Sequence, residues 1–91
     1  MIRVRIPPTL RTETGGAREV EADGATVGVL LDDLTARHPA LRDRLFEDGA
    51  VAAFVNVYLD GEDVRTLGGM DAPVRSGQTL ILLPAMAGGR A

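Results

Sequence analysis

The chain has 91 residues, which suits a single domain and leaves little room for a second. Its net charge is −3 and it has no basic stripe with interleaved aromatic residues, so nucleic acid is not an expected partner. Membrane-length apolar runs, a signal-peptide pattern and cysteine are all absent. These features exclude a disulfide framework and a thiol nucleophile, and they favour a cytoplasmic protein.

The first third of the chain predicts a hairpin followed by a helix. Residues 2–6 and 18–22 alternate apolar and charged side chains, as strands with one buried face do, and residues 9–17 between them suit a loose loop. Thr26 is a suitable N-cap for a helix over residues 26–37, whose apolar side chains recur at helical spacing. Pro39 should end that helix.

The rest of the chain predicts a short helix over residues 40–46, a loop, and strands at residues 54–59 and 79–83. Asp60-Gly61 is a strong turn signal, because both residues tolerate positive φ. Residues 62–65 should form a short strand or a turn, and residues 66–77 should be irregular.

This order of elements predicts an α+β roll of the β-grasp, or ubiquitin-like, type, with a mixed sheet and one main helix packed across one face. The first and last strands should lie parallel at the centre of the sheet. The expected core residues are Val4, Ile6, Val27, Leu30, Leu31, Leu34, Val55, Val57 and Leu82. Phe54 and Tyr58 should point away from the helix.

Residues that would carry catalysis are scarce, and we predict that the chain is not an enzyme. His38 is the only histidine and has no partner residues of a triad or metal site near it in the sequence. The acidic pairs Asp32-Asp33 and Glu62-Asp63 lack glycosidase or metal-loop spacing, and no phosphate-binding glycine motif is present. We therefore expect no catalytic residue, no bound metal and no bound cofactor.

The C-terminus is the most informative segment. The predicted strand at residues 79–83 runs into Pro84 and then into a short tail that contains Gly88-Gly89. Glycine can enter a narrow channel in conformations closed to other residues, so such a tail suits an enzyme that surrounds a terminal carboxylate. Chain ends are often glycine-rich without such a role, however, and Arg90 and Ala91 follow the diglycine here. We expect a domain over residues 1–84 and a flexible tail over residues 85–91.

Three stretches of the chain resemble the ubiquitin-like sulfur carriers of the MoaD and ThiS superfamily, and most of all its CysO type from actinobacteria. They are Phe-Val-Asn-Val-Tyr-Leu at residues 54–59, Glu-Asp-Val-Arg at residues 62–65, and Leu-Leu-Pro-Ala-Met-Ala-Gly-Gly at residues 82–89. The likeness covers essentially the whole chain.

The resemblance implies a chemistry in which other proteins do the catalysis. An ATP-using adenylating protein would activate the carboxylate of Gly89, and a sulfur donor would convert it to a thiocarboxylate. That group would give sulfide to a biosynthetic enzyme for cysteine, thiamin, molybdopterin or another sulfur-containing product. Met86, Ala87 and Gly88 would be recognised in the tail, and Phe54, Tyr58 and Leu82 would form the partner surface.

The chain departs from the active form of these carriers by the extension Arg90-Ala91. The resemblance implies cleavage between Gly89 and Arg90 by a JAMM-type zinc peptidase. Two other functions stay open: a protein modifier joined through Gly89 to lysines of target proteins, and an interaction module with an inert tail.

Overall fold

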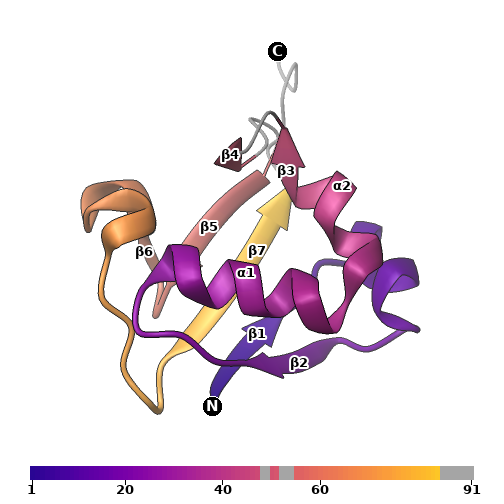
Figure 1. Cartoon of the computed structure of the whole chain (residues 1–91), viewed down its shortest axis with the longest axis horizontal. Helices are drawn as coiled ribbons and strands as arrows, with labels where there is room; N and C mark the ends of the chain where they lie inside the picture. Colours follow the sequence, from indigo (N-terminus) through magenta and orange to yellow (C-terminus); the bar gives the residue numbers. More distant parts are fainter. Residues whose placement is uncertain (48–49, 52–54, 85–91) are drawn as a thin grey trace.

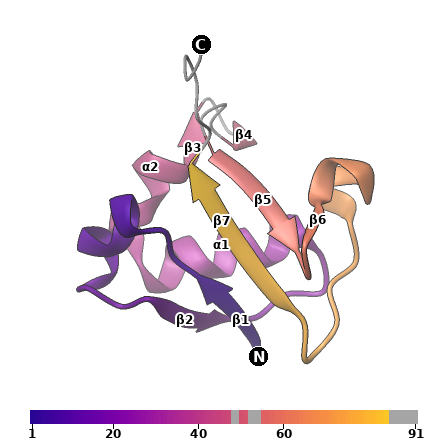
Figure 2. The same cartoon turned by 180° about the vertical axis from the view of Figure 1, so that it is seen from behind.

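The main helix, α1 (Val27–Arg37), lies across one face of a five-stranded sheet, and no helix of the described part of the chain covers the opposite face (Figures 1 and 2). The computed structural model describes residues 1–47, 50–51 and 55–84. No helix in these ranges is both long enough and apolar enough to cross a membrane.

The sheet is mixed, with strand order β2-β1-β7-β5-β6. Its strands are β1 (Ile2–Arg5), β2 (Glu19–Ala22), β5 (Val55–Leu59), β6 (Glu62–Asp63) and β7 (Thr79–Pro84). Strand β7 is central and pairs parallel with β1 and antiparallel with β5. This confirms the predicted β-grasp arrangement, with the first and last strands parallel at its centre.

Helix α1 (Val27–Arg37) begins and ends where the sequence predicts. The Thr26 hydroxyl accepts a hydrogen bond from the Val29 N–H at 3.3 Å, which satisfies one unpaired donor of the first turn. His38 is the C-cap, and Pro39 starts the next element.

The core lies between α1 and the sheet. All nine residues expected in it are buried, because the apolar stripe of α1 faces the inward side chains of β1, β5 and β7. Asp60 and Gly61 have φ values of 50° and 88°, which confirms the predicted tight turn between β5 and β6.

Several short elements differ from the prediction. The expected loop at residues 9–17 contains a 3₁₀ helix, η1 (Pro8–Thr14), which buries Leu10. The expected helix at residues 40–46 is a 3₁₀ turn, η2 (Pro39–Leu41), followed by α2 (Arg42–Leu45). Phe46 is therefore not helical, and it starts a small hairpin of β3 (Phe46–Glu47) and β4 (Ala50–Val51). The 3₁₀ helices η3 (Val64–Thr66) and η4 (Gly69–Asp71) follow β6.

Candidate functional site

Strand β7 carries the chain from the centre of the sheet to the edge at which the tail begins. Its residues face β5 in the register Leu80 to Leu59, Leu82 to Val57, and Pro84 to Val55. Leu80 and Leu82 point into the core, while Ile81 is half-buried and Leu83 is 43% exposed on the other face. Strand β7 is thus held in place by hydrogen bonds to β1 and β5 on its two sides and by the burial of Leu80 and Leu82.

The position of Leu82 corrects one prediction. We expected Leu82 in the core and also on the partner surface, and only the first holds, because its side chain is 1% exposed. Successive side chains of a strand point to opposite faces, so Leu83 takes the exposed position instead.

The face of the sheet opposite α1 is turned toward the viewer in Figure 2, and we call it the open face. On this face one residue from each of the five strands lines up in a row. The strand registers place them in the order Glu19, Arg5, Ile81, Tyr58 and Asp63. Charged residues occupy both ends of this row, and Ile81 and Tyr58 lie in the middle. The prediction that Tyr58 points away from the helix is confirmed, since Val57 and Leu59 on either side of it are buried.

Nearer the tail, Asn56 lies directly opposite Leu83. Together with the middle of the row, these two residues complete a small surface of mixed character, which we call the tail-end patch: Asn56, Tyr58, Ile81 and Leu83. It lies at the C-terminal end of β7, next to the start of the tail. Its apolar residues come from central strand β7 and the neighbouring strand β5, and the charged pair formed by Arg5 and Glu19, at 3.8 Å, borders it.

An ordered arginine borders the patch on the other side. The guanidinium of Arg65, from η3, donates to both carboxylate oxygens of Asp63 at 2.7–3.2 Å and from Nη2 to Asn56 Oδ1 at 3.3 Å. Asp63 also accepts the Arg65 backbone N–H at 2.9 Å and so caps η3. The side-chain and backbone hydrogen bonds from Arg65 lower the pKa of Asp63, and Asp63 in turn raises the pKa of Arg65.

Arg65 lies in the Glu-Asp-Val-Arg stretch of the resemblance, but sequence reasoning assigned it no role in the site. Its signal was the spacing of Asp63 and Arg65 two residues apart after a turn, but only the structure shows that the guanidinium reaches back over β5 to Asn56.

The remaining predicted site residues are outside the described residues. These are Phe54 of the partner surface, Met86, Ala87 and Gly88 of the tail, and Gly89 and Arg90 at the expected processing and activation site. Their roles stay predictions.

The residues considered for catalysis form no reactive arrangement in the described part of the chain. Asp33 accepts the Asp23 backbone N–H and the Arg37 Nε–H, both at 2.7 Å, and these two bonds lower its pKa. Asp63 is engaged by Arg65 in a similar way. Within residues 1–47, 50–51 and 55–84, no three histidine, aspartate or glutamate side chains come together in a way that could hold a metal ion.

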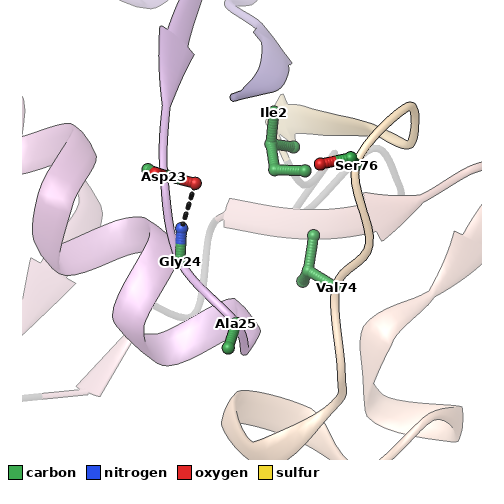
Figure 3. A pocket seen from close by; sticks show the side chains of 6 residues that line it. All are labelled: Ile2, Asp23, Gly24, Ala25, Val74 and Ser76. Atoms are coloured by element: carbon green, nitrogen blue, oxygen red, sulfur yellow. Dashed lines mark hydrogen bonds between the residues drawn. The ribbon is translucent and has the colours of Figure 1, made fainter.

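A shallow pocket of about 370 Å³ opens between the β2–α1 connection and the segment that precedes β7 (Figure 3). Ile2, Ala25 and Val74 contribute apolar side chains, and the Asp23 carboxylate already accepts the Gly24 N–H at 3.2 Å. Because Ile2 starts β1, which runs parallel to β7, the pocket lies at the opposite end of the sheet from the tail. It does not contribute to the tail-end site.

The fold and the site therefore define a ubiquitin-like β-grasp protein that presents an open sheet face beside a C-terminal tail. The ThiS family matches residues 4–89, which is nearly the whole chain up to the second glycine of the diglycine. The chain belongs to the ThiS family.

Individual relatives agree with this assignment. The chain is 40% identical over 91 residues to the sulfur carrier protein CysO of Mycobacterium tuberculosis, covering 97% of this chain and 98% of that protein. A chain in the crystal structure of the Amycolatopsis orientalis BexX/CysO complex superposes with a TM-score of 0.89 and is 48% identical, covering 98% of this chain and 100% of that one. Small archaeal modifier protein 1 of Haloferax volcanii is 41% identical over 81 residues, covering 85% of this chain and 88% of that protein.

Proposed function

We propose that this chain is a sulfur carrier whose reactive group is a thiocarboxylate formed on Gly89 after Arg90-Ala91 has been removed. The observation that carries the proposal is the family match over residues 4–89, whose end coincides with the second glycine. The similarity to CysO over nearly the full length of both proteins supports the same function.

In this function the chain is a substrate of enzymes. A carboxylate oxygen of Gly89 attacks the α-phosphate of ATP on an adenylating protein, and pyrophosphate leaves. The terminal sulfur of a persulfide then displaces AMP at the carbonyl carbon, and a thiol cleaves the resulting S–S bond to leave the thiocarboxylate. Both the carrier and the biosynthetic enzyme that accepts its sulfur as sulfide are cytoplasmic.

The structure suits this division of labour. Central strand β7 fixes the start of the tail, and the five residues from 85 to 89 reach at most about 17 Å beyond it when extended. We propose that the adenylating protein docks on the tail-end patch, with Phe54 predicted on the same face as Tyr58 and with Met86, Ala87 and Gly88 threaded toward the enzyme's active site. The similar chain in the Amycolatopsis orientalis BexX/CysO complex supports docking of this kind on another protein.

The test uses the full-length chain and the chain that ends at Gly89, each with ATP and the adenylating protein of the same organism. In the full-length chain Gly89 is an internal peptide carbonyl, so only the shortened chain should form an acyl-adenylate. With sulfide present, intact mass should show one carboxylate oxygen replaced by sulfur. Equal adenylation of both chains would refute the need for processing, which we assign to a JAMM-type zinc peptidase.

A protein modifier is the second candidate, because modifier proteins are among the relatives. Activation is common to both functions, so the products must separate them. A modifier predicts Gly89 joined to lysines of other proteins, whereas a carrier predicts a thiocarboxylate. An interaction module with an inert tail predicts that removal of residues 85–91 leaves function intact.

A further inference from the structure

Arg65 has a position that its contribution to folding does not explain. Its side chain is 72% exposed, yet Asp63 and Asn56 fix it by four hydrogen bonds from Nε and Nη2. Exposed ion pairs of this kind contribute little to stability, because water and salt screen them. A guanidinium held in one place on a solvent-exposed face is, however, well suited to bind a partner, since its ordering cost on binding is already reduced.

The place at which the guanidinium is held is informative. Asn56, which accepts from Nη2, lies directly opposite Leu83 in the β5–β7 register. Leu83 is the last exposed side chain described before the tail. A protein that receives the tail therefore meets apolar Leu83 on β7 together with the cationic guanidinium of Arg65, which comes from η3 and contacts Asn56 on the adjacent strand β5.

The donors that remain point to the chemistry of the partner. Asp63 and Asn56 take the hydrogens of Nε and Nη2, while Nη1 makes no hydrogen bond within the part of the chain that the structure describes. Nη1 therefore keeps N–H donors on a delocalised cation, and a carboxylate is the side-chain group that accepts a charge-assisted hydrogen bond from such a donor most strongly.

We propose that Arg65 is a specificity-determining residue of this carrier: it donates through Nη1 to a carboxylate of the adenylating protein and so orients the docked tail. This inference rests on the proposed function, because it assigns a role to the surface next to the tail. Asp63 is the positioning residue that holds the guanidinium.

The geometry also predicts which kinetic constant responds. The reacting carboxylate of Gly89 is five residues beyond Pro84, up to about 17 Å away along an extended tail. Arg65 therefore acts on docking, and its loss should raise KM for the carrier while kcat stays unchanged.

The experiment measures pyrophosphate release by the adenylating protein with the Gly89-ending chain as the varied substrate. Arg65→Ala should raise KM about tenfold, the size of a lost hydrogen bond between charged groups, with kcat and Tm unchanged. Arg65→Lys should recover part of the loss, because it keeps the charge without the planar fork. The KM of the unaltered chain should also rise more steeply with salt than that of Arg65→Ala.

Arg37→Ala is the matched control. Arg37 also pairs with an aspartate, Asp33, at 2.7 Å, but it lies on α1, away from the open face. Its KM should equal that of the unaltered chain. Equal KM for Arg65→Ala and the unaltered chain, or a fall in kcat alone, would overturn the proposal for Arg65. If the unaltered Gly89-ending chain is not adenylated at all, the proposed function fails and this inference falls with it.

Discussion

Two neighbouring leucines of β7 allow folding and docking to be separated within one strand. Leu82 is 1% exposed in the core and Leu83 is 43% exposed on the open face. Leu82→Ala leaves a cavity between α1 and the sheet, and such truncations cost about 2–5 kcal/mol. Leu83→Ala removes a side chain that keeps roughly half of its surface in water, so its cost should be near 1 kcal/mol, about half that of a fully buried leucine.

These costs are a large fraction of the unfolding free energy of the domain. A domain of this size has an unfolding free energy of about 5–14 kcal/mol, and each kcal/mol shifts Tm by about 4–8 °C. Leu82→Ala should therefore lower Tm by at least about 8 °C, whereas Leu83→Ala should lower it by less than about 8 °C.

Thermal unfolding monitored by circular dichroism measures the effect of each variant on stability. Titration of the adenylating protein with the folded variants measures the effect on docking. Leu83→Asp should weaken that binding while the domain stays folded, because it places a charge in the apolar part of the tail-end patch. The reasoning is refuted if Leu82→Ala is as stable as the unaltered chain, or if Leu83→Asp binds with unchanged affinity.

Two further predictions concern the connection that leads into α1. Gly24→Ala should destabilise the domain by about 1–3 kcal/mol, because a Cβ there would lie 2.7 Å from Leu30 Cα and 2.8 Å from the Val29 carbonyl carbon. Urea unfolding at neutral pH measures this loss of stability. An unchanged unfolding midpoint would show that the backbone shifts to accept the Cβ at no cost. The pKa of Asp33 is lowered in the folded state, chiefly by the hydrogen bond from the Asp23 N–H and then by Arg37. The ionised carboxylate therefore stabilises the fold at pH values above the unfolded-state pKa near 3.8. This contribution disappears as the pH falls through the lower folded-state pKa. The stability difference between the unaltered chain and Asp33→Asn should accordingly shrink as the pH falls below about 3.8, and a difference that stays constant down to pH 2 would contradict this assignment.

The sequence predicted the elements whose patterns have one physical meaning. The leucines of α1 repeat at helical spacing, and Thr26 and Pro39 mark its ends, so local chemistry and packing agree. Alternation likewise assigned the inward faces of β1 and β5, since only one face of each strand is apolar enough to pack beneath the helix.

The pattern was ambiguous in β7, where both faces are apolar. Only the register against β5, with Leu82 opposite Val57 and Leu83 opposite Asn56, decides which leucine is exposed. The 3₁₀ helix η1 carries one buried leucine and no periodic stripe, and the strands β3 and β4 are two residues each, so neither has a pattern long enough to be read. Asp63 holds the Arg65 guanidinium from two residues away, but the contact that places it over β5 is to Asn56, nine residues away in sequence, and no local motif specifies that contact.

The length of the tail provides a last prediction, which follows from the way β7 is held. Strand β7 pairs with β5 as far as Pro84, and fraying it to lengthen the tail would pull Leu82 out of the core at the cost estimated above. The reach of Gly89 is therefore set by residues 85–89 alone, about 17 Å at most, and deleting residues 85 and 86 should shorten it by about 7 Å. Because the open face and Arg65 are untouched, the deleted chain should keep its Tm and still dock on the adenylating protein, losing only the contribution of Met86 to affinity, while kcat for adenylation falls to background. Insertion of two glycines at the same place should be tolerated far better, since a longer flexible segment lowers the local concentration of the carboxylate only gradually. A deletion variant adenylated at the normal rate would show that the tail is longer than docking requires. It would also show that the distance from the end of β7 to the Gly89 carboxylate does not limit adenylation.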